Sequence, residues 1–139
     1  MSRLIPAELR EKMLENAWDM FKGRQDDHPP VVKLFSIVGS ATWLLSELNP
    51  LEPNVAFGLC DLGIGSPELG YVSLEELESI QYPSLPIPLV VRDEHFEAEE
   101  LMSVYVEAAR RHQRITENPT HLQQAHQWLA AKGKKPQYI

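Results

Sequence analysis

The chain has 139 residues, enough for one domain with a hydrophobic core, and its apolar fraction of 43% and charged fraction of 24% are ordinary for a globular protein. No apolar run approaches the roughly 18 residues that a membrane helix needs. The first residues lack the features of a signal peptide, and a single cysteine, Cys60, excludes an intrachain disulfide and a cysteine-based zinc site. We therefore expect a cytoplasmic protein that does not bind membranes.

Charge is distributed unevenly along the chain. Residues 1–109 hold 7 Lys and Arg against 19 Asp and Glu, and residues 110–139 hold 6 against one Glu, which together give the net charge of −7. An acidic body should repel nucleic acid. Charge runs are most often solvated surfaces; the alternatives are a basic C-terminus that contacts phosphate and an acidic body that imitates DNA.

A helix is predicted over about residues 7–22. Pro6 suits the first helical turn and Glu8 suits the positive end of the helix dipole, while Gly23 is a typical cap. Apolar residues recur between them at spacings of three and four: Leu9, Met13, Leu14, Ala17, Trp18, Met20 and Phe21. Such a stripe is expected to pack on a sheet, with membrane or partner binding as the alternative.

Three strands are predicted next, over residues 31–38, 42–48 and 55–62, because these segments are rich in β-branched and aromatic residues. The proline-rich linker 49–54 should close a hairpin between the second and third. A fourth strand over residues 68–72 leads into the sequence Ser-Leu-Glu-Glu, a capping box that predicts a short helix, 74–80.

The remaining elements are a short strand over residues 89–92, a helix over about 98–112 and a final helix that Asn118 caps and Gly133 ends. The predicted class is α+β: a small, mostly antiparallel sheet or partly open barrel of about five strands, with helices at its ends and on one face. We expect a single domain over residues 1–114 and a helical extension with a basic tail over 115–139.

The stretch VVRDEHF, residues 90–96, runs from apolar strand residues into four ionisable side chains. On a continuing strand Asp93 and His95 would share one face, where they could bind a divalent metal or orient an imidazole base. Glu47 and Asp61 could complete such a site, since each lies near the end of an apolar strand. We expect Trp43, Leu45 and Glu47 to share a face, as well as Phe57, Leu59 and Asp61.

The same polar residues have a structural interpretation. A carboxylate on an apolar strand must be paired or lie at the rim of the sheet, and Arg92 is the evident counter-charge for Glu47, Asp61 or Asp93. Bridges between strands are therefore the leading interpretation, ahead of a binding site and of a catalytic or metal centre. The other histidines and Cys60 are interpreted as structural or solvated.

Five blocks in order resemble a known bacterial family, called domain of unknown function 2958: HPPVVKLF (28–35), ATWLLSEL (41–48), AFGLCDLG (56–63), ELGYVSLEEL (68–77) and RDEHF (92–96). The resemblance covers about residues 7–114. It implies a small cytoplasmic protein of plasmids and other mobile genetic elements, found among genes for conjugation, replication or anti-restriction. It implies no catalytic residues.

The leading hypothesis is a non-enzymatic accessory protein without a cofactor. It would bind a protein partner through a rim that the following residues form: Glu47, Asp61, Arg92, Asp93 and His95, with Trp43 and Tyr71. An acidic mimic of DNA is one version of it. The first alternative is a metal-dependent hydrolase or nuclease that uses Asp61, Asp93 and His95. The second is nucleic-acid binding through the basic C-terminus: Arg110, Arg111, Arg114, Lys132, Lys134 and Lys135.

Overall fold

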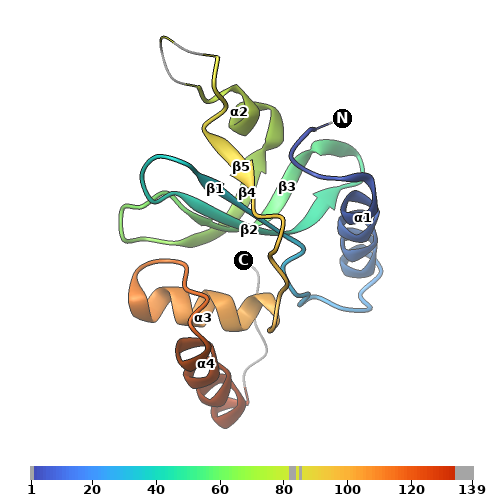
Figure 1. Cartoon of the computed structure of the whole chain (residues 1–139). Helices are drawn as coiled ribbons and strands as arrows, with labels where there is room; N and C mark the ends of the chain where they lie inside the picture. Colours follow the sequence, from blue (N-terminus) through green and yellow to red (C-terminus); the bar gives the residue numbers. More distant parts are fainter. Residues whose placement is uncertain (1, 82–83, 85, 134–139) are drawn as a thin grey trace.

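The computed structural model describes residues 2–81, 84 and 86–133. Its sheet has five strands in the order β4–β3–β2–β1–β5, and all neighbouring pairs are antiparallel (Figure 1). The sheet is open, with β4 and β5 as its edges, which confirms the α+β class. The strands are β1 (Val32–Ser36), β2 (Thr42–Asn49), β3 (Glu52–Asp61), β4 (Glu68–Ser73) and β5 (Val90–Arg92). The helices are α1 (Ala7–Phe21), α2 (Leu74–Ser79), α3 (Met102–His112) and α4 (Pro119–Lys132).

The helix ends follow local signals where these exist. Asn118 caps α4 by accepting from the Thr120 amide at 2.9 Å, and Gly133 ends that helix in the left-handed conformation. At α2 the Ser73 hydroxyl accepts from the Glu76 amide at 3.2 Å, as the capping box predicts. A second cap comes from the neighbouring strand β3, because Asn54 Oδ1 accepts from the Glu75 amide at 2.8 Å.

Helix α3 begins later than the predicted residue 98 because its cap is supplied by a distant loop. The Asp27 carboxylate accepts from both the amide and the hydroxyl of Ser103, and the His28 carbonyl accepts from the Met102 amide at 2.9 Å. These groups satisfy amides that a first helical turn leaves without partners. A cap 76 residues away in the chain cannot be detected from local spacing.

Helices cover both faces of the sheet, so the expectation that they lie at its ends and on one face only is wrong. Met13 of α1 packs with Trp43 and Leu45 in one core, whereas Leu44 packs with Tyr105 of α3 in the other. In the view of Figure 1, α1 lies to the right of the sheet and the α3–α4 pair lies below it. The central strand β2 therefore carries apolar side chains at successive positions, because both of its faces are buried. The predicted C-terminal extension contributes Leu122 and Ala125 to the second core.

A β-bulge in β2 changes the direction of the residues that follow it. Leu45 pairs with Gly58 and Glu47 pairs with Phe57, which leaves Ser46 as the extra residue. The Ser46 carbonyl accepts from the Asn16 side chain of α1 at 2.9 Å, so the bulge is also a contact between helix and sheet.

The bulge corrects one prediction about strand faces. Phe57 is two residues from Leu59, which lies in the α3 core, so Glu47 opposite Phe57 faces the same side. Trp43 and Leu45 face α1. The prediction that Glu47 shares a face with Trp43 and Leu45 is therefore wrong, because one inserted residue reverses the alternation.

Candidate functional site

The residues proposed from the sequence as one binding rim lie at three separate places. Trp43, Glu47 and Asp61 are buried, with exposed fractions of 4%, 7% and 3%. Tyr71 is 72% exposed and lies on β4, one edge of the sheet. The Arg92–His95 group lies at the end of β5, the opposite edge. The fold therefore does not bring these side chains together into a single surface.

Asp61 anchors the segment between α3 and α4. Its Oδ1 accepts from the Gly63 amide at 2.8 Å, and its Oδ2 accepts from the Ile115 amide at 2.9 Å. Both carboxylate oxygens thus satisfy backbone donors, one in the turn after β3 and one 54 residues away. A buried carboxylate with such partners has a structural role.

We expect Asp61→Ala to lower the free energy of unfolding by about 2 kcal/mol, because the Gly63 and Ile115 amides both lose a charged acceptor. Chemical denaturation measures this loss. Hydrogen exchange at Ile115 should accelerate more than exchange in β2. Equal acceleration at both places would show that Asp61 acts on the whole fold and not on this segment.

The cluster at the end of β5 is built around Lys33 of β1. The Lys33 ammonium lies 3.7 Å from the Asp93 carboxylate and also bonds to Glu117 of the α3–α4 segment. Arg92 lies 4.0 Å from Glu94, not near Glu47 or Asp61. The polar residues of this stretch do form ion pairs between elements, but the counter-charge for Asp93 is Lys33 and not Arg92.

Asp93 and His95 do not share a strand face because β5 ends at Arg92. The chain turns at this point: Asp93 Oδ1 accepts from the His95 amide at 2.9 Å, and the Asp93 carbonyl accepts from the Phe96 amide at 3.3 Å. This is the local bonding by which aspartate stabilises turns. Among the described residues, no group of three His, Cys, Asp or Glu side chains could hold a metal ion.

Glu47 is the most perturbed acid of the sheet. Burial raises its pKa from the usual 4.5 to about 7, and the Ser46 hydroxyl, 3.4 Å away, opposes this only weakly. No ion pair to its carboxylate is formed by the described cations. Glu47 is thus held in the sheet as an acid that is partly neutral at pH 7.

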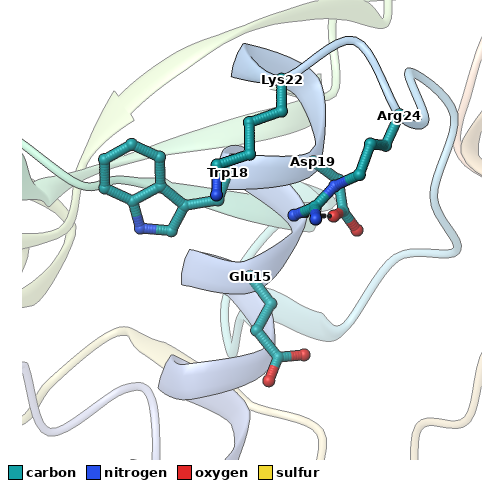
Figure 2. A pocket seen from close by; sticks show the side chains of 5 residues that line it. All are labelled: Glu15, Trp18, Asp19, Lys22 and Arg24. Atoms are coloured by element: carbon teal, nitrogen blue, oxygen red, sulfur yellow. Dashed lines mark ion pairs between the residues drawn. The ribbon is translucent and has the colours of Figure 1, made fainter.

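A group of side chains that sequence reasoning missed lies at the end of α1. Trp18 is 47% exposed and Phe21 is 67% exposed, with ring centroids 5.8 Å apart. Around Trp18 the surface is hollowed, and Figure 2 shows the side chains that line the hollow. We call these residues the α1 patch: Glu15, Trp18, Asp19, Phe21, Lys22 and Arg24.

The spacing along α1 contained a signal for this patch. Met13, Asn16 and Ala17 are the buried residues of the helix. Trp18 is one position beyond Ala17, and one position is a rotation of about 100° away from the core. The wide apolar stripe of the sequence therefore contains two faces, one packed on β2 and the other exposed.

The α1 patch is connected to α3 through buried His28. The His28 Nε2 atom lies 3.6 Å from Asp19 Oδ2, and Arg24 pairs with the same aspartate at 2.9 Å. Burial lowers the pKa of His28, although the Asp19 carboxylate opposes the shift. Since the His28 backbone also caps α3, the rim of the patch is fixed to the body of the domain.

The comparisons with known proteins identify a family. Residues 4–116 match the model of the family described as protein of unknown function (DUF2958). The chain belongs to the DUF2958 family. No curated protein and no solved structure matches it significantly.

The DUF2958 match extends from the segment before α1 to the segment after α3, and it ends before α4. It thus includes the α1 patch, the buried acids Glu47 and Asp61, and the pair of Lys33 and Asp93, but it ends just before Glu117. In the part of this DUF2958 protein that the structure describes, no helix is long and apolar enough to cross a membrane.

Proposed function

We propose that this DUF2958 protein is a non-enzymatic module that binds a protein partner through the α1 patch. The observation that carries the proposal is the exposure of Trp18 and Phe21 on a helix whose other face is packed in the core. Burial of a large aromatic side chain on binding is favourable, and such side chains are enriched at the centres of protein interfaces.

The surroundings of Trp18 support a protein partner. Charged groups of both signs border the ring: Glu15 and Asp19 are acidic, and Lys22 and Arg24 are basic (Figure 2). An apolar centre with a polar rim is the usual anatomy of a protein interface. The ion pair between Arg24 and Asp19 holds part of that rim in place, which lowers the entropy lost on binding.

The bonding of the sheet acids favours binding over hydrolysis. A metal-dependent enzyme that uses Asp61, Asp93 and His95 needs carboxylate oxygens directed to one ion. Both oxygens of Asp61 instead accept from backbone amides, and Asp93 pairs with Lys33. These carboxylates are occupied by structural contacts at two separate places, the end of β3 and the turn after β5.

The distribution of exposed acids does not favour imitation of DNA. These acids occur on several elements and segments: Glu8, Glu11 and Glu15 on α1, Glu68 on β4, Glu75 and Glu76 on α2, and Glu94, Glu97 and Glu99 after β5. On α1 itself, Lys12 lies 4.0 Å from Glu15, so charges of both signs alternate. A mimic of DNA would require one dense array of negative charge.

The double variant Trp18→Ala/Phe21→Ala tests the proposal. We expect it to fold, because neither ring belongs to a core cluster. We expect it to lose affinity for its partner by roughly 30-fold, as the removal of central aromatic side chains commonly does. The measurement is quantitative affinity capture from the native host, with wild type and variant as parallel baits.

Tyr71→Ala is the matched control, since Tyr71 is a 72% exposed aromatic residue on the edge strand β4 and not on α1. Its ring lies 5.0 Å from the Phe57 ring. Proteins captured by wild type and by Tyr71→Ala, but not by the α1 variant, would be specific partners. Capture that is equal for all three baits, or that is lost only with Tyr71→Ala, would contradict the proposal.

A further inference from the structure

Most cations of the acidic body are paired with carboxylates. Arg3 lies 3.7 Å from Glu78, and Lys33 and Arg92 are paired at the β5 edge as described above. Among the described residues, the Lys and Arg side chains without an ion pair fall into two groups: Arg10 and Lys22 on α1, and Arg110, Arg114 and Lys132 at the ends of α3 and α4.

One cation of the second group, Lys132, lies beside an aromatic ring that Arg111 also contacts. The Arg111 guanidinium lies 5.4 Å from the centre of the Trp128 ring, and the Lys132 ammonium lies 5.5 Å from it. Glu107 pairs with Arg111 at 3.0 Å. The contacts bring the ends of α3 and α4 together into one positively charged surface.

Two histidines extend this surface. The rings of His112 on α3 and His121 on α4 are stacked with centroids 3.6 Å apart, and His121 Nδ1 is 2.9 Å from the Thr116 hydroxyl. Desolvation lowers the pKa of His112, and the neighbouring His121, Arg114 and Arg111 lower it further. We call the whole surface the basic face: Arg110, Arg111, His112, Arg114, His121, Trp128 and Lys132.

Helix dipoles explain only part of this arrangement. Arg110 and Lys132 lie in the last turns of α3 and α4, where a cation is stabilised by about 0.3–1 kcal/mol. Arg114 lies beyond the end of α3, so it is outside the last turn in which the helix dipole stabilises a cation. In a chain with net charge −7, the dipoles do not account for Arg114, which, like Arg110 and Lys132, has no ion pair among the described residues, whereas Arg111 pairs with Glu107.

We propose that the basic face binds the sugar–phosphate backbone of nucleic acid. Phosphates can neutralise Arg110, Arg114 and Lys132, which have no ion pair among the described residues. The surface is separate from the α1 patch, so the acidic body can face away from the nucleic acid. Lys134 and Lys135, which the sequence also suggests for this role, lie outside the described residues.

Fluorescence anisotropy with a labelled DNA duplex of about 20 base pairs tests the proposal on the full chain. If Arg110, Arg114 and Lys132 each contact one phosphate, log affinity plotted against log salt should have a slope near −3. The affinity should then fall roughly 50-fold between 50 and 200 mM salt. Arg114→Glu/Lys132→Glu should weaken binding at least tenfold and make the slope shallower by about two units.

Arg10→Glu/Lys22→Glu is the control, because it makes the same change in net charge at two cations that also lack ion pairs. We expect it to weaken binding far less than the α3–α4 variant does. Three results would overturn the proposal: no binding of DNA at 50 mM salt, equal loss in both double variants, or binding to vesicles of anionic lipid without binding to DNA. Circular dichroism of both variants confirms that they are folded.

Discussion

Replacing Gly58 by alanine should destabilise the protein by about 3 kcal/mol or more, because the new methyl group would overlap the neighbouring strand. A Cβ atom at this position would lie 2.0 Å from the Leu44 carbonyl oxygen and 2.7 Å from the Leu45 Cα atom. Both are backbone atoms of β2, so the clash can be relieved only by moving β2 and β3 apart. Thermal and chemical denaturation measure the loss.

Gly70→Ala is the control for this effect. Gly70 pairs with Gly58 across β3 and β4, but a Cβ atom there meets nothing within 4 Å. We expect Gly70→Ala to raise the free energy of unfolding by about 0.5–1 kcal/mol, because alanine is more stable than glycine in a strand. If the two substitutions proved equally harmful, the cause would be strand flexibility and not the close approach of β2.

The second large effect is expected at Glu47, and it depends on pH. Folding raises the pKa of this acid from 4.5 to about 7, so the folded state binds more protons than the unfolded state between these values. Its contribution to stability is complete below pH 4.5 and is lost as pH rises through 7. We expect Glu47→Gln, which keeps the shape but cannot ionise, to stabilise the protein by up to about 3 kcal/mol at pH 8.

The effect of Glu47→Gln should become small near pH 4, because the wild-type side chain is then mostly neutral in both states. Urea denaturation at pH 4 and pH 8 gives the two differences directly. Glu52→Gln provides the comparison, since Glu52 is exposed on the same hairpin and its carboxylate is solvated in both states. Stabilisation of similar size at pH 4 and pH 8 would show that ionisation of Glu47 is not its cause.

The order and type of the elements could be read from the sequence because the signals are local. Period-2 and period-3.6 patterns, the hairpin linker and the Ser73 and Asn118 caps each depend on a few neighbouring residues. The start of α3 could not be read in this way, since Asp27 and His28 provide its cap from a distant loop. The family resemblance also rested on consecutive residues, and the match over residues 4–116 confirms it.

The candidate site was much less accessible to sequence reasoning. The acids were correctly treated as needing partners, but those partners are backbone amides for Asp61 and Lys33 for Asp93, which only the packing of α3 and α4 on the sheet brings near. The bulge at Ser46 was equally hidden, because its single extra residue is defined by the register with β3.

By itself, the sequence determined the class of the fold, the acidic body with its basic end, and the family. Tertiary structure alone decided which side chains meet. It placed Tyr71 and His95 at opposite edges of the sheet, exposed Trp18 on the outer flank of a packed helix, and gathered Arg111, Trp128 and Lys132 between two helices. The physical reason is that hydrophobic periodicity specifies local elements, whereas a surface is made by contacts between residues far apart in the chain.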